Sequence, residues 1–288
     1  MNVITFNERA WRHLPASVRN SRPGRAYGSR MHAVVSRRAQ REMYLGTVFL
    51  RNRPVLELMR RLITATDPVV APVRIAVLGC SIGVEVYSIV WTLRESTPDI
   101  DLTVRAIDIS PDAIETGRLG KYGPDALALA NWPIFDGLTK AEREAMFEWD
   151  DNGAHVKRWL QDGISWEVGD ASDPKLAARL GSQDIVAANN FLCHMQSDAA
   201  ERCLRNVAQL VAPGGHLFVA GVDLDVRTRV ALALGWEPIP DLREEIHDGD
   251  PLVRADWPWR WWGLEPFDRR RPDWETRYTA VFRIPGNR

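Results

Sequence analysis

Two short stretches of the sequence hold residues that could bind a nucleoside. The apolar run 74–79 ends in a turn of small residues, and an acidic residue follows two residues after that turn. A second apolar run ends in another acid about 25 residues later. Small residues let backbone N–H groups approach a ligand, and an acid at the next strand end can accept hydrogen bonds from ribose hydroxyls. This group comprises Gly79, Cys80, Ser81, Gly83, Glu85, Asp108 and Ile109.

The spacing of the glycines distinguishes between two kinds of nucleoside ligand. The turn lacks the G-x-G-x-x-G pattern that places a pyrophosphate at a helix N-terminus, so a dinucleotide fits poorly. S-adenosylmethionine (SAM) fits better, because its amino-acid end needs amides and polar groups and its ribose needs a carboxylate. We therefore expect SAM as the cofactor and S-adenosylhomocysteine (SAH) as its product.

Strands and helices alternate in the part of the chain that would position these residues. This alternation favours an α/β fold with a mostly parallel sheet and helices on both faces. Asp151-Asn152-Gly153 predicts a hairpin within 145–160, which we expect as a small antiparallel insertion in the main sheet. The expected strands are 74–79, 102–107, 164–168, 184–188, 216–221 and 278–284, and the expected helices are 83–95, 111–119, 139–146, 174–180, 197–211 and 226–234.

The N-terminal part has a different charge and pattern. Residues 1–61 contain thirteen arginines and three acids, although the whole chain has a formal net charge of −1. We expect 1–70 to be a basic helical segment, weakly ordered or loosely packed over 1–30 and helical over 31–65, with Pro54 opening its second helix. The arginines suggest an acidic protein partner, and the simpler alternative is a solvated helix face.

Composition excludes several other classes of protein. The apolar and charged fractions are those of a soluble globular protein, and no apolar run is long enough to span a membrane, so we expect a cytoplasmic protein. Cys80, Cys193 and Cys203 lack metal-ligand spacing, so no metal is expected. The expected fourth strand ends in "AANN" rather than DPPY or NPPY, so nucleic acid is not the expected substrate.

Four segments, in order, resemble the CheR-type chemotaxis receptor methyltransferases. They are "LGTVFLRNRPVLELMRRL", similar to a TxFFR-containing helix entry; "CSIGVEVYSI", similar to CSTGEEPYSI; "AIDISPDAIETGRLGKYG"; and "DIVAANNFLCHMQSDAAERCLRNVAQLVAPGGHLFVAG". The likeness runs from about residue 44 to 222. It implies a Rossmann-like class I SAM methyltransferase sheet with an antiparallel last strand, within a domain at 71–288.

The resemblance also implies roles for individual residues. Arg51 matches the TxFFR arginine, which approaches the methyl donor, and Glu85 lies where the family holds the methionine part. Asp108 matches the ribose-binding acid, and Asp170 matches a polar residue beside the adenine. The expected cofactor-binding set is Thr47, Arg51, Gly79, Cys80, Ser81, Gly83, Glu85, Asp108, Ile109, Asp170, Ala171, Asn189 and Asn190.

Departures from the family concern the methyl acceptor. Asn189 and His194 replace an arginine and a tyrosine that lie beside the carboxylate being methylated, so both are candidate catalytic residues here. The tryptophan-rich insertion 237–277 has no counterpart, and we expect it to cap the site. Candidate substrate contacts are His194, Trp257, Trp261 and Trp262.

These departures predict methyl transfer to an O or N atom of a small molecule or peptide. One alternative is a protein-glutamate O-methyltransferase acting on chemoreceptor-like helices. Another is a SAM-binding protein without catalytic activity.

Overall fold

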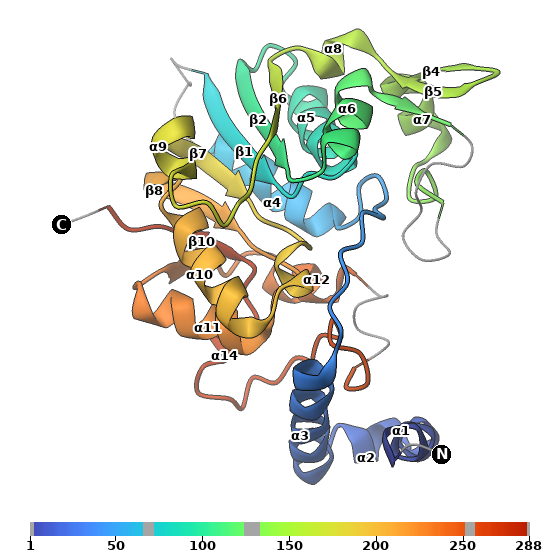
Figure 1. Ribbon diagram of the computed structural model, residues 1–288, viewed down its shortest axis with the longest axis vertical. Helices are drawn as coiled ribbons and strands as arrows, with labels where there is room; N and C mark the ends of the chain where they lie inside the picture. Colours follow the sequence, from blue (N-terminus) through green and yellow to red (C-terminus); the bar gives the residue numbers. More distant parts are fainter. Residues whose placement is uncertain (1–2, 66–71, 124–132, 251–256, 287–288) are drawn as a thin grey trace.

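The main sheet is mostly parallel, with antiparallel pairing at one end. The computed structural model describes residues 3–65, 72–123, 133–250 and 257–286, and Figure 1 shows their arrangement. The order is β6-β2-β1-β7-β8-β10-β9, in which β10 runs antiparallel to β8 and the pairs from β6 to β8 are parallel. The bounds are β1 Val73–Leu78, β2 Leu102–Asp108, β6 Ile164–Val168, β7 Gln183–Ala187, β8 Val211–Phe218, β9 Glu237–Pro238 and β10 Val281–Arg283. The predicted α/β fold class is confirmed.

Helices cover both faces of this sheet because its central strands are apolar on both sides. Ile75 and Val77 of β1 pack into one core with α4, α5 and α6, whereas Ala76 and Leu78 pack into a second core with α9, α10 and α11. The bounds are α4 Arg53–Thr64, α5 Val84–Ser96, α6 Pro111–Leu119, α9 Leu176–Leu180, α10 Ser197–Ala208 and α11 Leu224–Ala233. Pro54 lies in the first turn of α4, as predicted.

The predicted hairpin exists but does not extend the main sheet. Strands β4 (Phe147–Asp150) and β5 (Gly153–Val156) flank the expected turn, and β3 (Lys121–Tyr122) pairs with β5 to make a separate three-stranded sheet. Helices α7 (Lys140–Met146) and α8 (Arg158–Gln161) border it. Phe147 of β4 contacts the ring of Phe49 edge-on, which fixes this small sheet against the body of the domain.

The N-terminal segment is more helical at its start, and less so near the domain, than the sequence predicted. Helices α1 (Val3–His13), α2 (Ala16–Arg19) and α3 (Arg22–Arg38) fill the lower end of Figure 1. Within 7–30 only Trp11 and Gly28 are buried, so this part is helical but loosely packed. Ser21 begins α3 by accepting a hydrogen bond from the Gly24 amide. Residues 39–48, called the extended segment here, contain neither helix nor strand.

The apolar residues of the extended segment do not share one helix face, which explains why the helix expected over 31–65 is interrupted. Met43 and Tyr44 line a cavity, while Phe49 directly after the segment is completely buried in an aromatic cluster. Figure 1 shows the segment running from α3 to the sheet. The division of the chain at residue 70 stays a prediction.

The tryptophan-rich insertion 237–277 begins with β9, ends before β10, and includes α12 (Arg243–Asp248) and α14 (Trp274–Arg277). Trp257 and Trp259 pack with Trp11 of α1 in a small separate core. A Cβ on Gly28 of α3 would lie 2.3 Å from the Trp257 ring, so this glycine permits the close approach of helix and insertion.

Candidate active site

A cavity of about 660 Å³ opens at the carboxyl ends of β1, β2 and β7. This is where parallel α/β sheets bind ligands, and the volume is in the range of small-molecule sites. Its wall has two parts, which we call the donor side and the acceptor side. The donor side consists of Gly79, Cys80, Ser81, Glu85, Asp108, Ile109, Gly169, Asp170, Ala171, Asn189 and Asn190, and the acceptor side of residues 41–47, Arg51, Phe191, Cys193, His194, Met195, Gly221, Trp261 and Trp262.

The turn after β1 takes its shape from residues with positive φ. Gly79 has φ 64° and Ser81 has φ 49°, and a Cβ on Gly79 would lie 2.7 Å from the Phe191 ring. The Ser81 hydroxyl donates to the Leu45 carbonyl at 2.7 Å, which joins this turn to the extended segment. Gly83 does not line the cavity; a Cβ there would meet the Trp166 ring at 2.5 Å, so packing explains this glycine.

Asp108 is the central acid of the donor side. It is 4% exposed, and its Oδ2 accepts from the Ser81 amide at 2.7 Å while its Oδ1 accepts from the Ser110 amide at 2.9 Å. The carboxylate therefore holds the β1 and β2 turns together. Carboxylate oxygens have further lone pairs, so the same group can also accept from a ligand hydroxyl. Ile109, beside it, is 54% exposed in the cavity wall.

Glu85 and Asn189 form a pair at the end of the donor side. Asn189 donates from Nδ2 to Glu85 Oε1 at 2.6 Å, and its Oδ1 accepts from the Ala220 amide at 2.9 Å, which determines how the amide is oriented. Burial raises the pKa of Glu85, against the opposing effects of the Asn189 hydrogen bond and the Arg51 charge. Asn189 therefore orients a carboxylate that sits at a helix start.

Two further predicted residues line the cavity with local roles as well. Asp170 Oδ1 accepts from the amide of Ser172 at 2.8 Å and from its hydroxyl at 2.7 Å, so this acid also shapes its own loop. Asn190 has φ 61°, and its backbone N–H donates to the Ala220 carbonyl at 2.9 Å.

Both arginines of the acceptor side are paired with acids. Arg51 donates from Nε to Asp250 Oδ2 at 2.6 Å, and Arg41 donates from Nη2 to Asp223 Oδ2 at 2.9 Å. The Arg41 side chain is 2% exposed, and it also lies over the Trp261 ring at 5.6 Å. Sequence reasoning missed Arg41, because nothing distinguishes it from the other arginines of the N-terminal segment.

His194 is the one histidine in the described wall of the cavity. Its Nδ1 lies 2.6 Å from the Glu42 carbonyl oxygen, and because a carbonyl only accepts, Nδ1 carries the proton. Burial lowers the pKa of His194; the Glu42 hydrogen bond opposes this, and the charges of Arg41 and Arg51 add to it. The ring is therefore neutral at neutral pH, with Nε2 able to accept a proton.

An aromatic wall borders His194. Trp261 meets the imidazole edge-on with 5.5 Å between ring centroids, and Trp262 meets Trp261 at 5.1 Å. Met43 is 63% exposed and Tyr44 is 49% exposed on the same cavity. Side chains of this kind provide an apolar surface for a ligand.

One expectation for this side is not met by the geometry, and one lining residue was not predicted. Trp257, expected as a substrate contact, lies away from the cavity because its ring is buried against Trp11 and α3. Cys193 was not expected to line the cavity but does so; burial raises the pKa of its thiol to about 12, which leaves it protonated and a poor nucleophile. Within the described ranges, no group of three or more potential ligands could hold a metal ion.

Comparison with known proteins identifies the family. The family described as CheR methyltransferase, SAM binding domain, matches residues 46–224. The probable biofilm formation methyltransferase WspC of Pseudomonas putida is 29% identical over 191 residues, 64% of this chain and 42% of that protein. The chemotaxis protein methyltransferase of Campylobacter jejuni (strain 81-176) is 25% identical over 179 residues, 62% of this chain and 63% of that protein.

Likeness to solved structures is more distant. The plantazolicin methyltransferase BpumL in complex with SAH is 12% identical, covers 81% of this chain and 66% of that chain, and has a TM-score of 0.35.

The chain belongs to the CheR methyltransferase family, and the matched region is its SAM-binding domain. The described domain is thus a SAM-dependent methyltransferase, which confirms the predicted family, enzyme class and cofactor. The chain spans less than two thirds of the length of the curated relatives named here. Among the helices that the structure describes, none combines the length and apolar character needed to cross a membrane.

Proposed function

We propose that this protein transfers the methyl group of SAM to a neutral hydroxyl or amine on an apolar or aromatic small molecule or peptide. One observation carries the proposal: Arg41 and Arg51, the arginines that line the described cavity, are each paired with an aspartate. A carboxylate acceptor would enter without a free cation to pair with, and burying an unpaired charge is costly. The exposed Met43 and Tyr44 favour a partly apolar acceptor instead.

The residues of the donor side would hold SAM. Asp108 would accept from the ribose hydroxyls, Glu85 would pair with the amino group, and Gly169, Asp170 and Ala171 would border the adenine. Thr47 and Arg51 would lie near the methyl donor from the other side. These residues suit SAM because the cavity has carboxylates and a turn of small residues together at the carboxyl ends of the strands.

The proposed reaction is an in-line displacement. SAM, when bound, would supply an electrophilic methyl group to the lone pair of the acceptor oxygen or nitrogen, and the electrons of the carbon–sulfur bond would stay on sulfur in SAH. The acceptor proton moves to Nε2 of His194, which the Glu42 hydrogen bond leaves unprotonated. Trp261 and Trp262 would hold the acceptor in line, which lowers the entropic part of the barrier.

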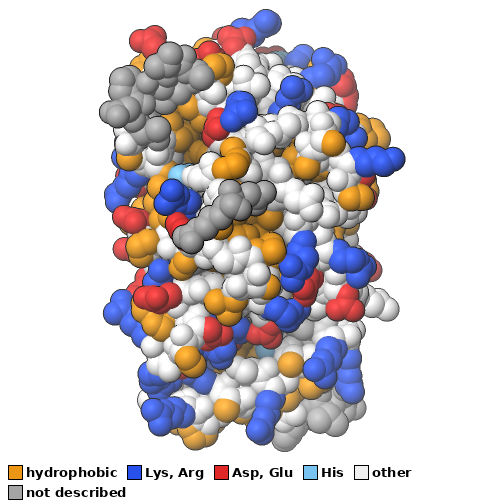
Figure 2. Space-filling view, turned by 90° about the vertical axis from the view of Figure 1, so that its left-hand side faces the viewer, with side chains coloured by type: hydrophobic (Ala, Val, Ile, Leu, Met, Phe, Trp, Pro, Cys, Tyr) orange, Lys and Arg blue, Asp and Glu red, His pale blue; other side chains and the backbone are white. Residues whose placement is uncertain are grey.

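A second candidate is protein-glutamate O-methylation, favoured by the relatives that are named chemotaxis protein methyltransferases. A helical partner rich in acids would meet the arginines of α1–α3, which form the lower end of Figures 1 and 2, where Figure 2 shows blue side chains and little red. A carboxylate acceptor needs no base, so this candidate gives His194 no proton to take.

Methyl-labelled SAM distinguishes the two. The protein is incubated with labelled SAM and a cell extract separated into protein and small-molecule fractions. We expect stable label in the small-molecule or peptide fraction. Label in the protein fraction that mild base releases as methanol would instead indicate glutamate esters and overturn the proposal.

A further inference from the structure

Arg41, in the described wall of the cavity, makes hydrogen bonds that play no part in the proposed methyl transfer. Arg41 donates from Nη1 to the Met195 carbonyl at 2.6 Å and to the Cys193 carbonyl at 3.3 Å, and from Nη2 to Asp223. These two carbonyls flank His194 in sequence. One buried guanidinium therefore binds the backbone on both sides of the proposed proton acceptor.

The next residue of the extended segment binds the imidazole itself. The Glu42 carbonyl accepts from His194 Nδ1, so two consecutive residues contact the histidine and both of its neighbours. We call this arrangement the Arg41–Glu42 clamp. The turn that carries His194, η1 (Leu192–His194), is only three residues long and has no side-chain cap. Besides its own backbone bonds, such as that from the His194 amide to the Phe191 carbonyl at 3.0 Å, the turn is held by the contacts from Arg41 and Glu42.

We propose that Arg41 is a positioning residue, and that docking of the extended segment completes the acceptor side by setting the tautomer and orientation of His194. The inference rests on the proposed function in one respect, that His194 takes the acceptor proton. It adds that the N-terminal segment is a component of the active site, and that the histidine is not preorganised without it.

Two arginines, two aspartates and one thiol lie around His194, and the arginine charges add to the burial that lowers its pKa. Arg41 of the extended segment and Arg51 after it are the cations, Asp223 and Asp250 are the acids bound to them, and Cys193 beside it is protonated. Removing the Arg41 charge therefore removes a factor that lowers the pKa of His194. Lysine at this position keeps the charge but lacks the planar guanidinium that bonds both carbonyls, so R41K tests positioning separately from charge.

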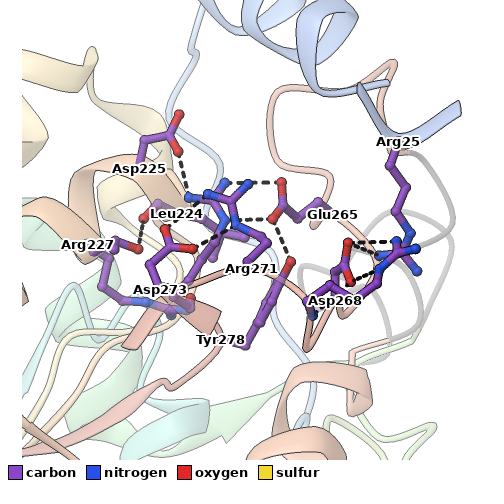
Figure 3. Close-up of polar contacts among 12 residues, drawn as sticks. Arg25, Leu224, Asp225, Arg227, Glu265, Asp268, Arg271, Asp273 and Tyr278 are labelled. Carbon is purple, nitrogen blue, oxygen red and sulfur yellow. Dashed lines mark hydrogen bonds and ion pairs between the residues drawn. The ribbon is translucent and has the colours of Figure 1, made fainter. Parts of the chain in front are cut away.

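A second arginine of the N-terminal segment provides a matched control. Arg25 of α3 donates from Nη1 to the carbonyls of Pro266 and Phe267, both at 2.9 Å, and lies 3.8 Å from Asp268. Figure 3 shows Arg25 beside Asp268. It too binds two carbonyls and faces an acid, but it does not line the cavity.

The test is a nitrogen-15 NMR titration of the histidine rings, which needs no acceptor. Wild-type protein, R41M, R41K and R25M are compared, and H194Q assigns the His194 signals. We expect wild type to show the Nδ1–H tautomer and a titration midpoint below 6.5. In R41M, His194 should show a mixture of tautomers and a higher titration midpoint. In R41K, it should show the same mixture with a smaller change in midpoint. In R25M, the His194 signals should match those of wild type.

Unchanged His194 signals in folded R41M would overturn the inference, as would the same change in R25M. If R41M does not fold, R41K decides, because it keeps the charge but not the guanidinium that bonds both carbonyls; unchanged His194 signals in R41K would then overturn the inference. Measuring the turnover of H194Q distinguishes a failure of this inference from a failure of the proposed function. If H194Q keeps full turnover while R41M alters the tautomer, the proposed base is wrong but the clamp stands.

Discussion

The donor side and the acceptor side of the cavity are built in different ways. The donor side comes from residues that follow β1, β2, β6 and β7 of one sheet. Its Ser81–Asp108 bond joins residues 27 positions apart, and its Asn189–Glu85 bond joins residues 104 positions apart. On the acceptor side, Arg41 and Glu42 bind residues 152 to 182 positions away. Neighbouring strand ends of one sheet build the donor side, whereas the acceptor side depends on segments outside the sheet docking together.

Replacing His194 by glutamine should separate the two sides most strongly. General-base catalysis contributes roughly 10²–10⁴-fold, so turnover should fall about a hundredfold or more, while SAH affinity by calorimetry stays the same. Because burial lowers the pKa of His194, wild-type turnover should stay constant as the pH falls and decline only below 6.5. H194Q should lack this decline. Full activity of H194Q would place the proton acceptor elsewhere.

Two tryptophans from one loop should give opposite results. W257A removes a buried ring that packs on Trp11, and we expect about 3 kcal/mol less stability by denaturant unfolding, with SAH affinity retained in the folded protein. W261A should instead raise KM for an apolar acceptor several-fold and change stability much less. If both variants mainly lose stability, the aromatic wall is only packing.

Asp108→Ala should weaken the donor side alone. Loss of charge-assisted hydrogen bonds costs about 1.5–3 kcal/mol, which is roughly a tenfold to hundredfold rise in the Kd for SAH by calorimetry. Asp184, whose carboxylate pairs with Arg74 outside the cavity, is the control, and D184A should bind SAH normally. Equal affinities of D108A and wild type would contradict the assignment of the ribose site.

Glu85→Gln should have the smallest effect and combine weaker SAH binding with unchanged or slightly higher stability. Burial raises the pKa of Glu85, so the folded protein binds this proton more tightly than the unfolded chain, and the carboxylate opposes folding at neutral pH. The gain in E85Q should therefore be present near pH 7 and disappear below the unfolded pKa of 4.5. Thermal unfolding at both pH values tests this; lower stability at pH 7 would contradict it.

Most of the sheet could be predicted from sequence, because short sequence patterns between turn residues define its strands and helices. The expected helix 111–119 and strand 164–168 have the bounds observed for α6 and β6, because each is a short apolar pattern between turn residues. Expected donor-side residues such as Asp108 and Asp170 line the cavity for the same reason. Gly83 shows the limit of this reasoning, since a glycine in such a turn can serve packing instead.

The acceptor side could be predicted only in part. His194 and Trp261 were recognised as departures from a family pattern, whereas Arg41 and Cys193 carry no such signal. Trp257 and Trp261 lie four residues apart, yet one is buried against α1 and the other lines the cavity. The extended segment was misread as helix because its apolar residues serve two different surfaces.

The contact between Arg41 and Trp261 has a consequence for engineering. The extended segment and the loop of Trp261 come from opposite ends of the chain but meet beside the same histidine. A chimera that exchanges only one of them with a relative would join mismatched surfaces and lose its substrate. Exchanging both together, with the strands that hold the methyl donor left intact, is the smallest graft that could transfer acceptor choice from one methyltransferase to another.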